Sequence, residues 1–211
     1  MLDTLEKIFG SGAKVKILRL FLFNPTEGFD IDQIAERAKV TPAVARYETA
    51  LLQKAGVIKR KSFFRDFIVG RKKEIERRRV SGWTLHEEFE YLEPLTTLLE
   101  YISAKRNQEI IKTLSRAGKL KLVIISGFFI RNRDSRVDML IVGDDLKRGK
   151  LEQAIKLIES EFGREIRYAA FETADFRYRL GVYDKLIRDI LDFPHEAILD
   201  KLGLQPIQPI R

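Results

Sequence analysis

Cysteine is absent from this sequence of 211 residues, and histidine occurs only twice, at His86 and His195. Without cysteine, the chain can form neither disulfide bonds nor metal sites built from thiolates. The two histidines lie far apart in the sequence, whereas a structural zinc site needs four protein ligands. We therefore expect no structural metal, and no residue pattern points to a bound cofactor.

Long uninterrupted apolar runs are also missing. No run approaches the roughly 20 residues that a helix needs to cross the hydrocarbon core of a membrane. The first twelve residues carry acidic side chains and lack the apolar stretch of a secretory signal peptide. We therefore expect a soluble, cytoplasmic protein that makes no contact with a membrane.

Positive charge is present in excess and is concentrated in one segment. The formal net charge is +8, and residues 57–85 alone hold ten basic and three acidic side chains, a net charge of +7. A positive field concentrated in this way favours a polyanionic partner. The alternative is a solvated hairpin without a partner, as charged segments often are.

The chain is long enough for two small domains, and its 45% of hydrophobic residues can supply a core for each. We predict an α+β protein with an N-terminal domain over 1–92 and a long linking helix over 93–118. A small α/β domain should follow over 119–204. The last residues, 205–211, contain two prolines, which favours a flexible tail.

Local signals in the N-terminal domain predict several helices and then a hairpin. Asp30 is a good N-cap for one helix, and Thr41 followed by Pro42 begins another. Alternating and β-branched runs on both sides of the basic turn at 70–73 are typical of a β-hairpin. The expected helices cover 2–9, 13–23, 31–38 and 42–54, and the hairpin covers 57–85.

The helix that begins at Pro42 is expected to project from the domain. Its inward face should hold Val44, Leu52 and Ala55, with Ala45 or Thr49 beside them. A projecting helix fits the major groove of B-DNA, which is ~12 Å wide. The outward residues are then Ala43, Arg46, Tyr47 and Gln53.

Arg46 is the strongest candidate for a base contact, because a guanidinium can pair with two acceptors on guanine. Tyr47 either contacts DNA or packs against the hairpin. Trp83 should anchor the hairpin to the core, while the hairpin's cations contact phosphates or enter the minor groove. The predicted DNA-binding residues are Thr41, Ala43, Arg46, Tyr47, Gln53, Lys59, Arg60, Lys61, Arg71, Lys72, Lys73, Arg77, Arg78 and Arg79.

This half of the chain resembles the winged helix-turn-helix regulators of the ArsR/MarR type. The resemblance covers roughly residues 5–100 and rests on Ile31–Ala35, Val40–Pro42, Leu52–Ile58 and Gly82–Leu85. It implies sequence-specific binding to double-stranded DNA, with the hairpin as the wing. The metal-sensing branch of that family uses cysteines, so the resemblance does not extend to metal sensing.

The second half of the sequence differs from the first in its pattern of apolar residues. Two apolar runs, 120–125 and 137–142, predict strands that are buried on both faces. An amphipathic helix over 150–162 and a third strand over 165–171 should follow. Three short helices are expected after that, over 174–180, 183–192 and 196–202. The charged spacing around Tyr178–Asp189 is more typical of a packed surface than of a site.

The runs Ile124–Phe128 and Ser135–Gly143 resemble the minimal nucleotidyltransferases of the polymerase-β type, over about residues 119–192. That family holds phosphates with a Gly-Ser pair and Mg²⁺ with two carboxylates that lie one residue apart on a strand. Here Phe128 stands at the serine position. Arg136 stands at the first carboxylate, which leaves Asp138 alone.

A shift of one step in the alignment still leaves one acid missing, with Leu140 at the second position. The resemblance therefore implies a vestigial nucleotide site of Gly127, Phe128, Arg136 and Asp138, with no catalytic residues and no bound metal. Asp138 should instead pair with Arg136 or cap a loop. On this view the chain is not an enzyme.

The sequence as a whole predicts a DNA-binding transcriptional regulator. The second domain would serve as a sensor for an unknown small molecule or as a platform for a protein. A homodimer is expected, with Leu95, Leu99 and Ile102 as its seam unless this stripe packs on its own domain. Two alternatives stay open: an active Mg²⁺-dependent nucleotidyltransferase targeted by a nucleic-acid-binding arm, and an antitoxin-like protein that binds a partner chain.

Overall fold

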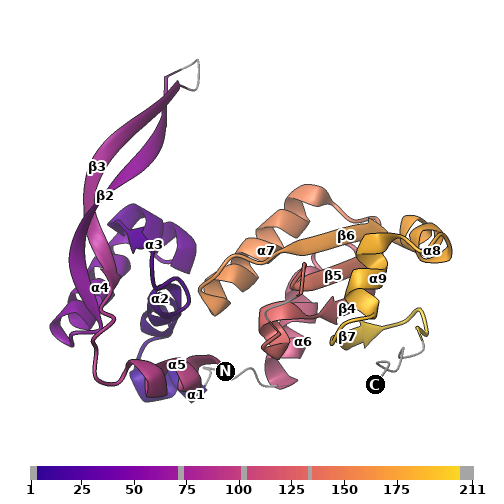
Figure 1. The fold of residues 1–211 in the computed structure, drawn as a ribbon, viewed down its shortest axis with the longest axis horizontal. Helices are drawn as coiled ribbons and strands as arrows, with labels where there is room; N and C mark the ends of the chain where they lie inside the picture. The colour runs from indigo at the N-terminus through magenta and orange to yellow at the C-terminus, as the bar shows by residue number, and fades with distance from the viewer. Residues whose placement is uncertain (1–3, 71–73, 101–103, 133–134, 205–211) are drawn as a thin grey trace. The chain divides into compact units, whose positions relative to one another are not determined.

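The computed structural model describes residues 4–70, 74–100, 104–132 and 135–204 (Figure 1). The protein is mixed α+β with two separate sheets, as the sequence predicts. Its contacts divide the chain into two compact units. The first unit comprises 1–101 and 159–164, and the second comprises 102–158 and 165–211. Among the residues described, no helix is long and apolar enough to cross a membrane.

Side-chain caps fix where the helices of the first unit begin. The Ser11 hydroxyl accepts a hydrogen bond from the backbone N–H of Lys14 at the start of α2. Asp30 and Gln33 form a reciprocal capping box at the start of α3. Thr41 caps α4, and Pro42 is the first residue of that helix. The helices of this unit are α1 (Thr4–Phe9), α2 (Gly12–Leu22), α3 (Ile31–Ala38), α4 (Pro42–Lys54) and α5 (Leu92–Glu100).

The sheet of the first unit is antiparallel, with strand order β1-β3-β2. Its strands are β1 (Gly28–Phe29), β2 (Ile58–Val69) and β3 (Glu74–Leu85). β2 and β3 form the predicted hairpin and pair without interruption from Ile58 with Leu85 to Val69 with Glu74. Gly82 lets β1 lie against β3, because a Cβ at this position would overlap the carbonyl of Phe29.

The core of the first unit joins the helices to the base of the hairpin. Phe21 of α2 meets Phe29 of β1 edge to face, with ring centroids 5.6 Å apart. Burial of each such side chain contributes about 1.5–3 kcal/mol. The buried hydrophobic residues of this core include Ile17, Phe21, Phe29, Ile34, Ala45, Leu52, Ile58, Trp83, Leu85 and Leu99.

The predicted linking helix corresponds to α5 and to α6 (Ala104–Leu114). Residues 101–103 between them lie outside the described residues. The predicted dimer seam is wrong on this helix, because Leu99 is only 2% exposed and Leu95 also packs on the core of the first unit. The alternative, that the stripe packs on its own domain, is confirmed for these two residues. Ile102 lies outside the described residues.

The second unit is built on a four-stranded sheet with strand order β6-β5-β4-β7. β5 and β6 are parallel and are joined by α7 (Arg148–Phe162), while the other neighbours are antiparallel. Its strands are β4 (Lys119–Ile125), β5 (Met139–Asp144), β6 (Tyr168–Glu172) and β7 (Glu196–Asp200). The remaining elements are a short 3-10 helix η1 (Gly127–Ile130), α8 (Thr173–Gly181) and α9 (Lys185–Leu191). Phe176 of α8 and Ile187 of α9 pack against Leu122 and Leu140 of the sheet.

One element of the second unit is predicted wrongly. Residues 196–202 are expected to form a helix, but Glu196–Asp200 is the strand β7. It pairs with β4, for example Leu199 with Val123. The open edge of β4 offers backbone hydrogen bonds that outweigh the weak local preference of this segment for a helix.

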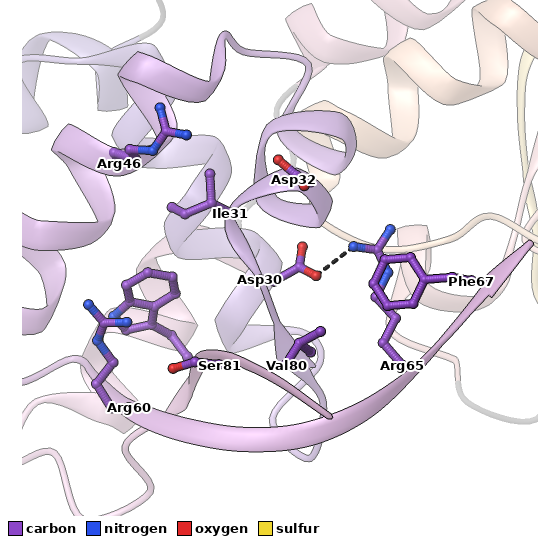
Figure 2. Close-up of a pocket in the computed structure, with 10 residues that line it drawn as sticks. Asp30, Ile31, Asp32, Arg46, Arg60, Arg65, Phe67, Val80 and Ser81 are labelled. Atoms are coloured by element: carbon purple, nitrogen blue, oxygen red, sulfur yellow. Dashed lines mark hydrogen bonds and ion pairs between the residues drawn. The ribbon is translucent and has the colours of Figure 1, made fainter. Parts of the chain in front are cut away.

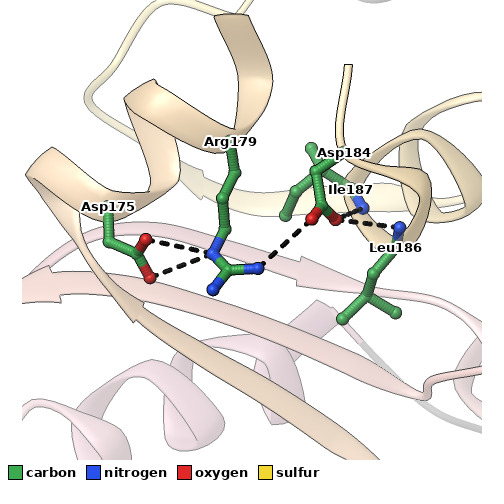
Figure 3. A network of polar contacts seen from close by, with 5 residues as sticks. All are labelled: Asp175, Arg179, Asp184, Leu186 and Ile187. Carbon is green, nitrogen blue, oxygen red and sulfur yellow. Dashed lines mark hydrogen bonds and ion pairs between the residues drawn. The ribbon is translucent and has the colours of Figure 1, made fainter. Parts of the chain in front are cut away.

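The charged cluster near Tyr178–Asp189 links two helices (Figure 3). Arg179 of α8 donates to Asp175 at 3.0 Å and to Asp184 at 3.2 Å. Asp184 in turn accepts hydrogen bonds from the backbone N–H groups of Leu186 and Ile187 at the start of α9. The hydrogen bond to Asp175 raises the pKa of the Arg179 guanidinium above its ordinary value. The cluster thus fastens α8 to the N-terminus of α9, as expected of a packed surface.

Candidate nucleic-acid interface

α4 rests on the first unit through a stripe that the sequence predicts in part, since Leu52, Ala45 and Thr49 are buried as expected. Ala45, Glu48, Thr49 and Leu52 are buried, and they follow the i, i+3, i+4, i+7 spacing of one helix face. The predicted inward position of Val44 and Ala55 is wrong, since both are exposed. Two members of the true stripe are polar, and Lys14 lies 3.7 Å from the Glu48 carboxylate, so hydrophobicity alone does not reveal the buried face.

The opposite face of α4 is open at its N-terminal end. Ala43 and Arg46 are exposed, and Tyr47 is 66% exposed. This exposure excludes the alternative that Tyr47 packs in the core against the hairpin. Within the described part of the chain, Arg46 has no ion-pair partner. Thr41, which is also exposed, uses its hydroxyl to accept from the backbone N–H of Val44 at 3.3 Å.

A chain of three side chains fixes the hairpin to α4. The indole N–H of Trp83 donates to the Gln53 side chain at 2.7 Å. The guanidinium of Arg60 lies over the Trp83 ring, 4.1 Å from its centroid. Trp83 therefore anchors the hairpin, as predicted. The side-chain oxygen of Gln53 is used in this hydrogen bond. Arg60 lies beside α4, and its charge is exposed.

The pairing register sorts the hairpin's cations onto two faces. Residues that pair across the ladder share a face, and faces alternate along each strand. We call the side that bears Trp83 the Trp83 face, and it carries Arg60, Arg77 and Arg79. The opposite face carries Lys59, Lys61, Arg65 and Arg78.

The two faces differ in how their charges are used. On the opposite face, Arg65 pairs with Asp30 at 2.5 Å, and Arg78 pairs with Glu76 at 2.6 Å. The hydrogen bond to Glu76 raises the pKa of Arg78. On the Trp83 face, none of the three arginines forms an ion pair within 4 Å among the residues described, although Asp66 stands opposite Arg77 in the ladder. Three basic side chains against one acidic side chain leave this face with a net positive charge for an external anion.

α3, α4 and the hairpin line an open pocket of about 500 Å³ (Figure 2). Arg46 reaches it from α4, and Arg60 reaches it from the hairpin. Asp32 and the Asp30–Arg65 pair lie on its α3 side. The lining residues are Asp30, Ile31, Asp32, Arg46, Arg60, Arg65, Phe67, Val80, Ser81 and Trp83. The structure thus brings together side chains of α4 and β2 that are 14 positions apart in the sequence.

Asp30 holds the hairpin and α3 at the same time. One carboxylate oxygen accepts from the backbone N–H of Gln33 at 2.9 Å, and the other accepts from Arg65. We predict that Asp30→Ala lowers the free energy of unfolding by about 1–2 kcal/mol, because the helix loses its cap as well as the ion pair. Chemical denaturation measures this change.

The matched variant is Asp30→Asn, which preserves a capping oxygen and removes only the charge. It should cost less than about 1 kcal/mol. Equal losses in the two variants would show that the pair with Arg65, and not the cap, supplies the stability.

Three of the predicted DNA-binding residues, Arg71, Lys72 and Lys73, lie outside the described residues. Lys59 and Lys61 are exposed on the opposite face of the hairpin. Three exposed apolar residues on the Trp83 face are absent from the predicted DNA-binding set, namely Phe64, Ile68 and Ile75. Their alternation with charged residues along the strands could have revealed them.

The predicted vestigial site of the second unit is assembled only in part. Gly127, Phe128 and Asp138 lie together, but Arg136 pairs elsewhere, with Asp189 at 3.0 Å. The expected pair of Asp138 with Arg136 is therefore wrong. Arg167, just before β6, takes that place, and the hydrogen bond to Asp138 raises the pKa of its guanidinium.

The Asp138 carboxylate is 1% exposed and accepts four hydrogen bonds. Arg167 donates three of them, from its backbone N–H at 3.0 Å and from its guanidinium at 3.0 and 3.1 Å. The backbone N–H of Phe128 donates the fourth at 3.3 Å. Gly127 has φ +57°, and a Cβ at this position would overlap the carboxylate. The acid therefore sits in a closed structural pocket.

The described residues contain no group of three or more His, Cys, Asp or Glu side chains that could hold a metal ion. Comparison with models of protein families, with curated proteins and with solved structures finds no match for this chain.

Proposed function

We propose that the protein is a sequence-specific DNA-binding transcriptional regulator whose first unit is a winged helix-turn-helix. In this proposal α3 and α4 form the helix-turn-helix, and β2 and β3 form the wing. The observation that carries it is the open pocket shared by Arg46 of α4 and Arg60 of the hairpin. Neither cation has a carboxylate partner among the described residues, and their positions on a helix and a β-ribbon suit a duplex that contacts both elements.

In the proposed complex, the N-terminal part of α4 enters the major groove. Arg46 pairs with the two acceptors of a guanine, and Tyr47 beside it contacts a phosphate or a thymine methyl group. Arg60, Arg77 and Arg79 contact the backbone phosphates, which supplies affinity but not sequence preference. Arg71, Lys72 and Lys73 at the hairpin turn add to this attraction.

A single winged helix contacts few base pairs, and we therefore propose a homodimer on two half-sites about one helical turn apart, ~34 Å. In this proposal the exposed side chains of Ile8, Tyr91 and Leu98 contribute to the dimer interface, because Leu95 and Leu99 are used in the core. Sedimentation of the free protein tests the dimer.

For the second unit we propose a nucleotidyltransferase-like scaffold that has lost catalysis and serves an effector or a protein partner. The bonds between Asp138 and Arg167 support this proposal, because a guanidinium satisfies the carboxylate that would otherwise bind Mg²⁺. An active nucleotidyltransferase would need that carboxylate free.

Fluorescence anisotropy with labelled DNA tests the proposed function. The full chain should bind duplex DNA, and its affinity should fall as salt rises, with a log–log slope near −0.9 for each phosphate neutralised. A single strand of the same sequence should bind more weakly, since it offers no major groove. Absence of duplex binding at low salt would contradict the proposal.

A separate prediction concerns the base contact proposed for Arg46. Arg46→Ala should reduce the discrimination between a preferred duplex and one with a substituted guanine by about 1–3 kcal/mol, the amount that a bidentate contact supplies. Lys54→Ala, at the other end of α4, is the matched control and should leave the preference unchanged. Competition with duplexes substituted at single positions measures both. Unchanged preference in Arg46→Ala would show that α4 is placed wrongly in the groove.

A further inference from the structure

The far end of the hairpin carries an exposed apolar pair. Ile68 and Ile75 face each other across the last rungs of the ladder and are 75% and 74% exposed. Both lie on the Trp83 face, where Phe64 is also exposed nearer the base. Figure 1 shows the hairpin extending well beyond the helices of its own unit, so the pair has no cover from the domain. Apolar residues this exposed in a paired rung suggest a surface that is covered on binding.

Two arginines and one acid follow this pair toward the base on the same face. Arg77 lies two rungs from Ile75, opposite Asp66, with its guanidinium 5.3 Å from the centroid of the Phe64 ring. Arg79 lies two rungs further, directly opposite Phe64. In the sequence, Arg71, Lys72 and Lys73 follow immediately after Gly70 at the turn. An apolar tip flanked by arginines fits a partner with an anionic surface and an apolar interior.

Charge argues against a second copy of the hairpin as that partner. The described strands hold seven basic and three acidic side chains, so two tips would repel each other. Duplex DNA has the required combination, with phosphates outside and stacked bases inside. Ile68 lies eight residues beyond Arg60, roughly 26 Å along an extended strand. That reach is less than one turn of DNA, ~34 Å, so a duplex held by α4 extends to the tip.

We propose that Ile68 and Ile75 form a wedge that enters the minor groove, partly unstacks one base step and bends the duplex. This inference rests on the proposed function and specifies how the hairpin engages DNA. Branched apolar side chains that enter the minor groove separate base pairs in this way, and the bend brings more DNA onto the protein. Pyrimidine–purine steps such as TA unstack most easily, so they are the preferred points of entry.

The test compares DNA bending by the wild-type chain and by Ile68→Ala/Ile75→Ala. A short duplex rich in TA steps, with a donor dye and an acceptor dye at its ends, reports the bend by energy transfer at saturating protein. A 2-aminopurine base in a TA step reports unstacking. The wild type should raise both signals, and the double variant should lose both. Affinity should fall by only about tenfold, because the cost of unstacking offsets much of the gain from apolar burial.

The matched control is Val182→Ala, which removes an exposed branched apolar side chain at the end of α8 in the second unit and should bend DNA like the wild type. Binding by the wild type without a bend would overturn the wedge and leave the proposed function standing. Absence of duplex binding by the wild type would overturn both. Self-association of the free wild-type chain that the double variant loses, or binding of the wild type to anionic lipid vesicles that the double variant loses, would assign the tip to another partner and would also overturn the wedge.

Discussion

Replacement of Arg60, Arg77 and Arg79 by glutamine should weaken duplex binding about a hundredfold near physiological salt. The log–log salt slope should become shallower by about 2.7, which is 0.9 for each phosphate that is no longer neutralised. The effect is large because these three guanidiniums have no carboxylate partner among the described residues, so their charge is free for DNA. Anisotropy titrations over a range of salt concentrations measure both quantities.

The hairpin itself offers a control with the same change in net charge. Lys59, Lys61 and Arg78 lie on the opposite face, and Arg78 is already paired with Glu76. Their replacement by glutamine should weaken binding by less than about tenfold, through the loss of long-range attraction alone. Equal losses in the two triple variants would mean that total charge, and not the Trp83 face, governs binding. Thermal unfolding checks that Arg60→Gln, which loses its stacking on Trp83, leaves the domain folded.

Asp138→Ala should destabilise the second unit by about 3 kcal/mol or more. The buried carboxylate satisfies the backbone N–H groups of Arg167 and Phe128, and each donor left without an acceptor costs about 1–3 kcal/mol. Hydrogen exchange of β4 and β5 amides measures this loss for the second unit specifically. Asp145→Asn is the control, because that carboxylate is exposed and its pair with Lys119 should contribute less than about 1 kcal/mol. Asparagine also tolerates the left-handed backbone of this position, φ +59°.

The same variant separates the two interpretations of the second unit. A catalytic carboxylate can be removed with little loss of stability, whereas its loss abolishes chemistry. Incubation with labelled nucleotides and Mg²⁺ should give no incorporation with the wild type. Incorporation by the wild type that disappears in a stably folded Asp138→Ala variant would contradict the structural role and support the enzyme.

The sequence predicts well the features that depend on adjacent residues, such as helix starts and the hairpin. Asp30, Thr41 and Pro42 mark helix starts because their side chains or ring geometry act on adjacent backbone groups. The hairpin follows from alternation on both sides of a glycine-containing turn. The exposure of Arg46 follows from helical spacing and holds in the structure, whereas the sequence leaves open whether Tyr47 is exposed or packs against the hairpin.

The errors all concern contacts between distant segments. Val44 is assigned to the buried face of α4 because it is apolar, yet Glu48 and Thr49 take that face against the rest of the unit. Glu196–Asp200 is a strand because β4 offers it an edge. Leu99 is buried in its own unit and not at a seam between two chains. In each case, contacts with a distant part of the chain determine the structure of the segment. The sequence of the segment itself does not reveal those contacts.

The candidate sites, too, are predicted from the sequence only where they depend on neighbouring residues. The cationic hairpin is visible in the sequence, but the separation of Arg60, Arg77 and Arg79 from the paired Arg65 and Arg78 depends on register and ion pairs. Asp138 can be identified as a lone acid from spacing. Its partner Arg167 lies 29 residues away and is brought in by the parallel pairing of β5 with β6.

Selection of bound fragments from a random duplex pool tests most directly whether α4 and the hairpin form one DNA-binding surface. The wild-type chain should enrich a defined motif containing guanine. Arg46→Ala should enrich a broader motif, and the variant of Arg60, Arg77 and Arg79 should retain little DNA of any sequence. A wild-type pool that remains random, or a motif that survives both changes, would contradict a shared DNA-binding surface.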